Sequence, residues 1–118
     1  MPRDAALYLA DILDACAAIQ EYTSGRTFED YEKDRAFRSS VEREFTIIGE
    51  AVAQMRKFHP VVASQITYAR QIVDFRNILV HGYSMVRHDL VWEALTKQVP
   101  FLATEIEALL RQTKDSLP

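Results

Sequence analysis

Cysteine, glycine and proline are all scarce in this sequence of 118 residues, which contains one, three and four of them respectively. Cys16 has no partner in the chain for an intramolecular disulfide, and its apolar neighbours indicate a small core residue in a reducing cytosol. With so few glycines and prolines, the chain has few places for turns. The composition therefore favours a small number of long helices over many short strands.

Long hydrophobic runs are missing as well. No apolar run approaches the roughly 18 residues that indicate a membrane span. The first residues, MPRDAALYLADIL, lack an uninterrupted apolar stretch followed by a cleavage site. We therefore expect a cytoplasmic protein with no signal peptide and no membrane partner. Since 118 residues are enough for one hydrophobic core, we expect a single domain over residues 1–118.

Positive charge is not in excess. The formal net charge is −3, which argues against a protein that coats nucleic acid through charge alone. RNA as a substrate then requires basic groups that are gathered locally, and Arg35, Arg38 and Arg43 are candidates. The alternative is a solvated helix face on which Glu42 and Glu44 balance the arginines, and the pattern favours this alternative.

Four segments repeat apolar residues at steps of three and four, which is the period of an α-helix. The segments follow one another without a linker, a repeat or a low-complexity stretch. The predicted fold is therefore all-α, an antiparallel bundle of four long helices plus short helical segments. The predicted stripes are Leu9, Ile12, Cys16 and Ile19; Val41, Phe45, Ile48, Val52 and Met55; Tyr68, Ile72, Phe75 and Leu79; and Leu95, Val99, Leu102, Ile106 and Leu109.

Cap and turn residues delimit these segments. Thr27, with Asp30 three residues later, resembles a capping box that opens a short helix. Pro100 predicts a kink or a local restart inside the last segment. The residues predicted to end the first three segments are Gly25, Pro60 and Gly82.

The stretch RNILVHGY, which begins at Arg76, carries the candidate chemistry. On a helix with about 100° per residue, Asn77 and His81 fall on the polar side, opposite a stripe centred on Ile72. Arg76 lies about 140° around the helix from His81 and about 7.5 Å along it. One straight helix does not bring the two together. Either the helix end bends at Gly82, or the arginine of one copy meets groups of a second copy.

These residue types suit the cleavage of a phosphodiester. Histidine, with an ordinary pKa of about 6.5, can give and take a proton near neutral pH. The guanidinium of Arg76 offers a planar fork of donors to phosphate oxygens. Asn77 can orient either group, and Tyr83 can hydrogen-bond the phosphate or stack on a base. The alternative is an ion pair and a helix cap without catalysis, and the residues alone favour that alternative.

Other candidate sites are weaker. No His, Cys, Asp and Glu residues show metal-ligand spacing, and there is no glycine-rich phosphate loop, so we expect no metal and no cofactor. His59 and His88 stand alone. We expect Glu50 to form an ion pair with an arginine across the bundle, such as Arg76. Trp92 falls off the main stripe, which predicts an interface rather than a core position.

The chain resembles a known family at this motif and beyond it. The spacing of Arg76, His81 and Tyr83, with Asn77 directly after the arginine, is similar to the Arg-x4-His-x-Tyr signature of HEPN-domain ribonucleases. Segments IIGEA (47–51), FRNILVHGY (75–83) and DLVW (89–92) resemble the HepT toxin family. The likeness covers roughly residues 5–112, with the segments in the same order. Family members often carry a tryptophan shortly before the motif helix, where this chain has SQIT.

The resemblance implies a HEPN-type helical bundle that forms a homodimer in which two motifs face one cleft. It implies a metal-independent endoribonuclease toxin that cuts RNA, with Arg76, His81 and Asn77 as catalytic residues. The implied partner is an antitoxin, a minimal nucleotidyltransferase that attaches AMP to the motif tyrosine, here Tyr83. The alternative function is a non-catalytic HEPN-like dimer that only binds a nucleotidyltransferase or presents substrates to it.

Overall fold

A computed structural model describes residues 3–115, without the side chains of Tyr83 and Asp115. Over this range the elements are helices and turns, with no strand, as the composition predicted. The long helices are α1 (Ala5–Thr23), α3 (Arg35–Phe58), α5 (Ala69–His81) and α7 (Val99–Asp115). The short elements are α2 (Phe28–Lys33), α4 (Pro60–Ala63), α6 (His88–Glu93), the 3₁₀ turn η1 (Tyr83–Met85) and the π turn η2 (Ala94–Gln98).

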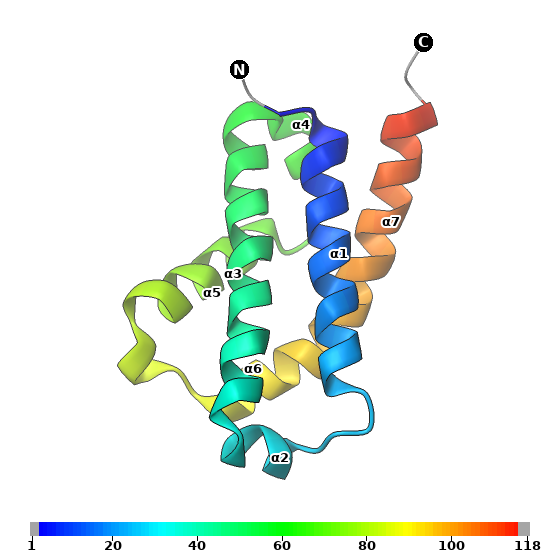
Figure 1. Ribbon diagram of the computed structural model, residues 1–118. Coiled ribbons are helices and arrows are strands. Elements are labelled where there is room, and N and C mark those ends of the chain that lie inside the picture. The colour runs from blue at the N-terminus through cyan, green and yellow to red at the C-terminus, as the bar shows by residue number, and fades with distance from the viewer. Residues whose placement is uncertain (1–2, 116–118) are drawn as a thin grey trace.

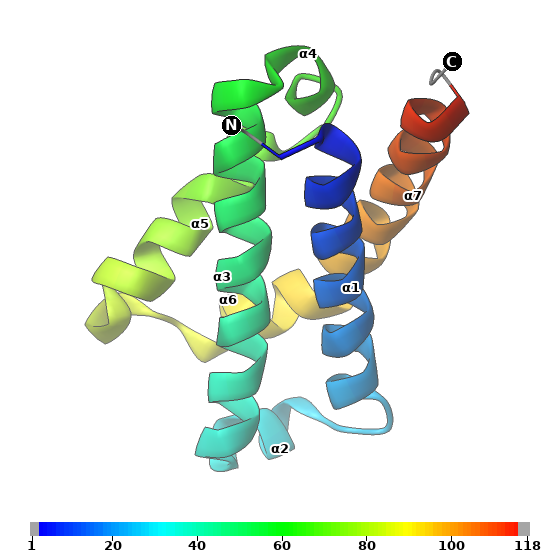
Figure 2. The ribbon, with the colours of Figure 1, turned by 45° about the horizontal axis from the view of Figure 1, so that its top comes forward.

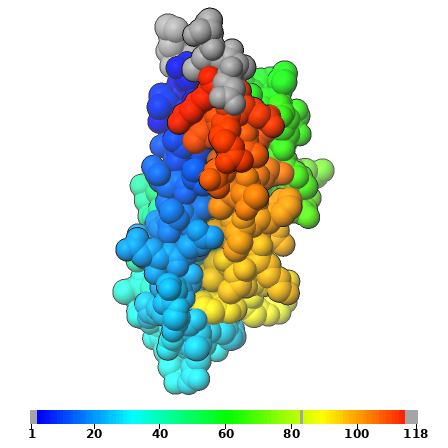
Figure 3. Space-filling model, turned by 90° about the vertical axis from the view of Figure 1, so that its right-hand side faces the viewer, coloured from blue at the N-terminus to red at the C-terminus, as the bar shows by residue number. Residues whose placement is uncertain are grey.

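Helices α1, α3 and α7 form the body of the molecule. Helix α1 packs against both α3 and α7 and runs antiparallel to them (Figure 1). Figure 3 shows α1 and α7 side by side along one face. Helix α5 packs mainly on α3, and its C-terminal end projects away from the body (Figures 1 and 2). In the part of the chain described, no helix is long and apolar enough to cross a membrane.

The helix ends lie where the cap and turn residues predicted them. Gly25 has a φ of 72°, in the left-handed region that glycine adopts without strain. The capping box is formed, because Asp30 N–H donates to the Thr27 hydroxyl at 3.2 Å and Thr27 N–H donates to the Asp30 carboxylate at 2.9 Å. Helix α3 ends at Phe58, two residues before Pro60.

The core consists of the apolar stripes of α1, α3 and α7. Each large apolar side chain removed from water stabilises the fold by about 1.5–3 kcal/mol. Burial also raises the pKa of Cys16 to about 12, so this thiol stays protonated and unreactive. All residues of the three predicted stripes are buried, namely Leu9, Ile12, Cys16, Ile19, Val41, Phe45, Ile48, Val52, Met55, Leu95, Val99, Leu102, Ile106 and Leu109.

The stripe on α5 is less buried than predicted. Ile72, Phe75 and Leu79 are half-buried, and Tyr68 is 43% exposed. The ring of Phe75 meets that of Phe45 on α3 edge-on, with centroids 5.2 Å apart. Because α5 packs mainly on one helix instead of lying between two, only part of its apolar side is covered.

Helices α2 and α6 pack together around Tyr31 at one end of the bundle. The Tyr31 ring is fully buried, edge-on to Phe37 and His88 and tilted against Trp92, with centroids 5.4, 5.9 and 5.8 Å away. Trp92 is half-buried, with α2 covering part of its ring, so its position at an interface stays a prediction. The Tyr31 hydroxyl is buried without a hydrogen-bond partner among residues 3–115, and burial raises its pKa.

The last part of the chain is a helical run in which the π turn separates α6 from α7. Helix α7 begins at Val99, one residue before the restart predicted at Pro100. A π turn accommodates one residue more than an α turn. Val91 and Leu95 therefore stay buried together with Val99, although the three residues are spaced by four and four.

Candidate active site

The polar face predicted for α5 is present. Asn77 and His81 are both exposed, whereas Ile72, on the opposite side of the helix, packs against the core. His81 is the last residue of α5, at the end of the helix that projects from the body (Figure 2). This position suits an imidazole that exchanges protons with a bound molecule.

Gly82 follows α5 as its C-cap, as predicted. Its N–H donates to the carbonyl oxygen of Ile78 at 2.8 Å, and its φ of −118° is open to any residue. A Cβ atom at Gly82 would lie 3.3 Å from the same carbonyl oxygen. Glycine at this C-cap therefore allows a close approach to the carbonyl oxygen of Ile78, and it is not needed for a left-handed conformation.

Arg76 and His81 are not brought together within one chain. Helix α5 continues to His81 without a break, so the bend at Gly82 that could have joined them is absent. Five residues of α-helix place the two side chains about 140° apart around the axis and about 7.5 Å apart along it. A site that uses both groups therefore needs groups from another surface, such as that of a second copy of the chain.

Arg76 is half-buried against α3. Its Nε atom is covered and has no hydrogen-bond partner in the described part of the chain. Within the same residues the side chain makes no hydrogen bond or ion pair. The terminal Nη atoms are therefore free to bind an anion from outside the chain.

The ion pair expected between Glu50 and Arg76 is not formed. Glu50 is exposed and has no ion-pair partner within residues 3–115. The physical reason is the rotation of α3. Gly49 is the residue of α3 that faces Arg76, and Glu50 points about 100° further around the helix.

Two other predictions have different outcomes. The Tyr83 side chain lies outside the described residues, so its substrate-binding and modification roles stay predictions. Among the three arginines considered as local basic groups, Arg38 donates through Nη1 to the carbonyl oxygens of Tyr31 and Glu32, at 3.1 and 2.5 Å. This nitrogen is therefore engaged at the end of α2.

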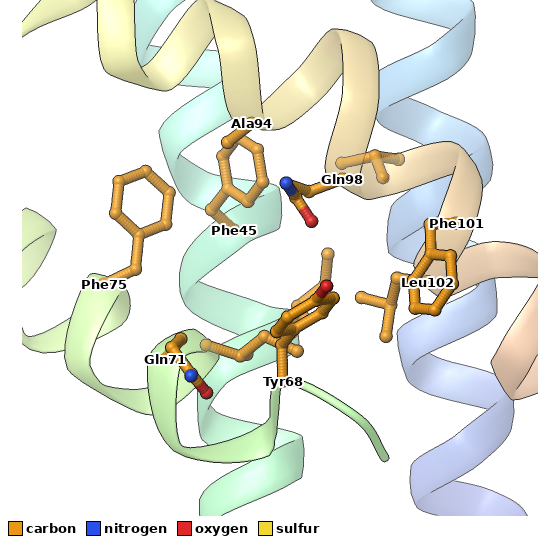
Figure 4. Close-up of a pocket in the computed structure, with 11 residues that line it drawn as sticks. Phe45, Tyr68, Gln71, Phe75, Ala94, Gln98, Phe101 and Leu102 are labelled. Atoms are coloured by element: carbon orange, nitrogen blue, oxygen red, sulfur yellow. The ribbon is translucent and has the colours of Figure 1, made fainter.

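An apolar groove of about 380 Å³ lies beside α5 (Figure 4). Tyr68 and Phe101 meet across it with ring centroids 5.7 Å apart. The candidate catalytic side chains do not line this groove, which makes it a surface separate from the motif. It is lined by Phe45, Ile48, Tyr68, Gln71, Ile72, Phe75, Ala94, Gln98, Val99, Phe101 and Leu102.

The comparison with protein families shows the family of the chain. The family model described as "Ribonuclease HepT-like" matches residues 12–109. The chain belongs to the HepT-like ribonuclease family. The match includes the whole of α3 and α5, and therefore Gly49 and the complete HepT-like motif from Arg76 to Tyr83.

Several relatives resemble this HepT-like chain over most of its length. A protein of Caldanaerobacter subterraneus subsp. tengcongensis, named as a candidate RNase, is 32% identical over 107 residues, which cover 91% of this chain and 95% of that protein. "Probable ribonuclease HepT" of Thermococcus cleftensis is 30% identical over 106 residues, covering 86% and 92%. No solved structure gives a significant match.

Sequence reasoning missed two features of this HepT-like site. Gly49 was part of the resemblance but received no role, although a glycine in the interior of a predicted helix is itself a signal of close packing. The groove beside α5 was also missed. Phe101 lies off the apolar stripe of its helix. This departure from the helical period was the only signal of the groove in the sequence.

Proposed function

We propose that this protein is the toxin of a toxin–antitoxin pair, a metal-independent endoribonuclease that cuts RNA at a site shared by the two subunits of a homodimer. Arg76, His81 and Asn77 are its catalytic residues. The observation that carries the proposal is the separation of Arg76 and His81 on one unbroken helix of a HepT-like ribonuclease fold. Each chain then supplies only part of a complete site.

The chemistry follows from the residue types. The His81 imidazole accepts the proton of a ribose 2′-hydroxyl, and the 2′-oxygen attacks the adjacent phosphorus. The bond from phosphorus to the 5′-oxygen breaks, and the imidazolium returns a proton to that leaving oxygen. The Nη atoms of Arg76 bind the phosphate oxygens as negative charge builds up on them. Asn77, one turn before His81, orients the substrate or the imidazole.

Surface composition supports the homodimer. Ile78 and Val80 of α5 are 47% and 43% exposed, and no residue of α5 is fully buried. Burial of exposed apolar side chains at the motif end of α5 by a second copy removes apolar area from water, and two-fold symmetry brings two motif helices to one interface.

The antitoxin is proposed to be a minimal nucleotidyltransferase that attaches AMP to Tyr83, and the setting to be the cytoplasm. AMP at this position adds negative charge and a purine two residues from His81. Both oppose the approach of an anionic RNA backbone. Control by a second enzyme fits an active site that the chain itself leaves open to solvent at the end of α5.

RNA degradation by the purified protein in excess EDTA tests the proposal. His81→Ala is expected to lower the cleavage rate by about 10²–10⁴-fold, which is the usual contribution of a general acid–base group. The fold should be retained because His81 is exposed. His59→Ala is the matched control, since His59 lies at the end of α3 and its ring contacts Arg3 and Tyr8.

Each outcome has a defined meaning. Cleavage that is lost in EDTA and restored by Mg²⁺ contradicts the metal-free mechanism. Cleavage that survives in His81→Ala contradicts the assignment of the site. A folded wild-type protein that leaves RNA intact supports the alternative, a non-catalytic HEPN-like dimer that binds a nucleotidyltransferase or presents substrates to it.

A further inference from the structure

Gly49 lies at the point where α3 and α5 come closest to the candidate catalytic arginine. A Cβ atom built on Gly49 would lie 2.2 Å from Cβ of Arg76, 2.6 Å from its Cγ and 3.4 Å from the carbonyl oxygen of Ile72. A separation of 2.2 Å is far below van der Waals contact. The position of a Cβ atom is set by the backbone, so no change of rotamer relieves the overlap with Arg76 Cβ.

A glycine is costly at this place in the chain, because it lies in the interior of a 24-residue helix. Glycine in a helix interior destabilises the helix relative to alanine. The residue is buried between the helices and does not lie at a turn, so conformational freedom does not explain it. What it provides is space for the stem of Arg76.

The consequence for Arg76 is a fixed direction. Its Cβ and Cγ pack against α3 at Gly49, and its Nε atom is covered. No hydrogen bond or ion pair within the described residues holds the guanidinium in place. Packing of the stem is therefore what determines where the Nη atoms lie.

We propose that Gly49 is a positioning residue for catalysis: by letting α3 and α5 approach closely, it places the guanidinium of Arg76 on the phosphate in the transition state. This inference rests on the proposed ribonuclease function. Gly49 itself touches no substrate. Displacing a catalytic group by about 1 Å can cost on the order of 10²-fold in rate, and the overlap at Gly49 requires a shift of this size.

The test is the steady-state cleavage of RNA by Gly49→Ala, measured at a temperature at which circular dichroism shows a folded protein. We expect kcat to fall by about 10–100-fold while KM changes by less than about threefold, since contacts made only in the transition state are lost. Ile12→Ala is the control. Ile12 is fully buried in α1, away from α5, so this variant loses stability but keeps kcat when folded.

The outcomes separate this inference from the proposed function. A wild-type protein without cleavage refutes the proposed function. An active wild type beside a folded Gly49→Ala of equal kcat refutes the positioning role, as does an equal loss of kcat in Ile12→Ala. If Gly49→Ala does not fold, the unfolding transition of the double variant Gly49→Ala/Arg76→Gly tests the close contact instead. Removal of the Arg76 side chain should restore cooperative unfolding, and failure to restore it refutes the close contact.

Discussion

The hydroxyl of Tyr31 is a polar group buried in the aromatic cluster between α2 and α6 without a partner in residues 3–115. A buried donor that makes no hydrogen bond loses its interaction with water and gains nothing in return. Tyr31→Phe removes the hydroxyl and keeps the ring. We expect the free energy of unfolding in urea to increase by about 1 kcal/mol.

Tyr22→Phe provides the control for that measurement. Tyr22 is exposed on α1, so its hydroxyl is hydrated in both the folded and the unfolded state, and its removal should leave stability unchanged. A loss of stability in Tyr31→Phe would mean that a water molecule or another group bonds to the hydroxyl in solution.

Modification of Tyr83 is the second prediction at the scale of a residue. Incubation with the partner nucleotidyltransferase and ATP should add the mass of AMP to the wild-type protein and abolish RNA cleavage. Tyr83→Phe should escape modification and retain part of its cleavage, because the hydroxyl contributes at most a hydrogen bond to the substrate. Intact-mass spectrometry measures the adduct. Equal addition to Tyr83→Phe, or none to the wild type, contradicts the assignment.

The sequence predicted the exposure of single residues where the helical period alone determines it. Asn77 and His81 lie on the exposed face because their phase on the helix is set by local spacing alone. The surroundings of Arg76 were not predictable in this way. They depend on the rotation of a second helix, and a difference of one residue in that rotation put Gly49 where Glu50 was expected.

Helix α5 is the least protected of the long helices. It has no buried residue and packs mainly on α3, so we expect its amide hydrogens to exchange faster than those of α1, α3 and α7. If a second copy covers α5, its exchange should slow as the protein concentration rises. Hydrogen-exchange mass spectrometry at two concentrations measures this. Exchange in α5 that is as slow as in α3 at the lowest concentration contradicts the expectation.

Helix positions and caps were predictable because each depends on a few neighbouring residues, as the capping box at Thr27 shows. The burial of α5 was not. Its apolar period is as regular as that of α7, and periodicity states which side of a helix is apolar but not how many neighbours cover it. The apolar side of α5 is only partly buried in this chain. The fold of a single chain therefore does not explain why that side is apolar.

For the whole molecule, the main prediction is a homodimer at micromolar concentration. Ile78→Asp places a charge at an exposed apolar position of α5 and should yield a folded monomer with little RNA cleavage, because burial of an unpaired charge is unfavourable. Val61→Asp is the control, since Val61 is 74% exposed on α4, away from the motif. Sedimentation velocity measures the mass. A wild-type monomer that cleaves RNA contradicts the shared site.

The family assignment rests on nearly the whole bundle rather than on the motif from Arg76 to Tyr83 alone, because the matching region extends from α1 to α7. That extent is why the fold and the family could be inferred together from the sequence. The single-domain organisation expected for residues 1–118 stays a prediction.

The π turn η2 sets where the length of this protein can change. Deletion of one residue between Ala94 and Gln98 would let the turn close as an α-helix while α6 keeps its orientation on α7, because the π turn holds the one extra residue. Val91 would stay in the core, and Trp92 would stay against Tyr31. Deletion of one residue within α7 would instead rotate the two parts of that helix by about 100° relative to each other. Single-residue deletions during evolution should therefore accumulate at 94–98 and in the loops at 24–27 and 64–68, and not within α7.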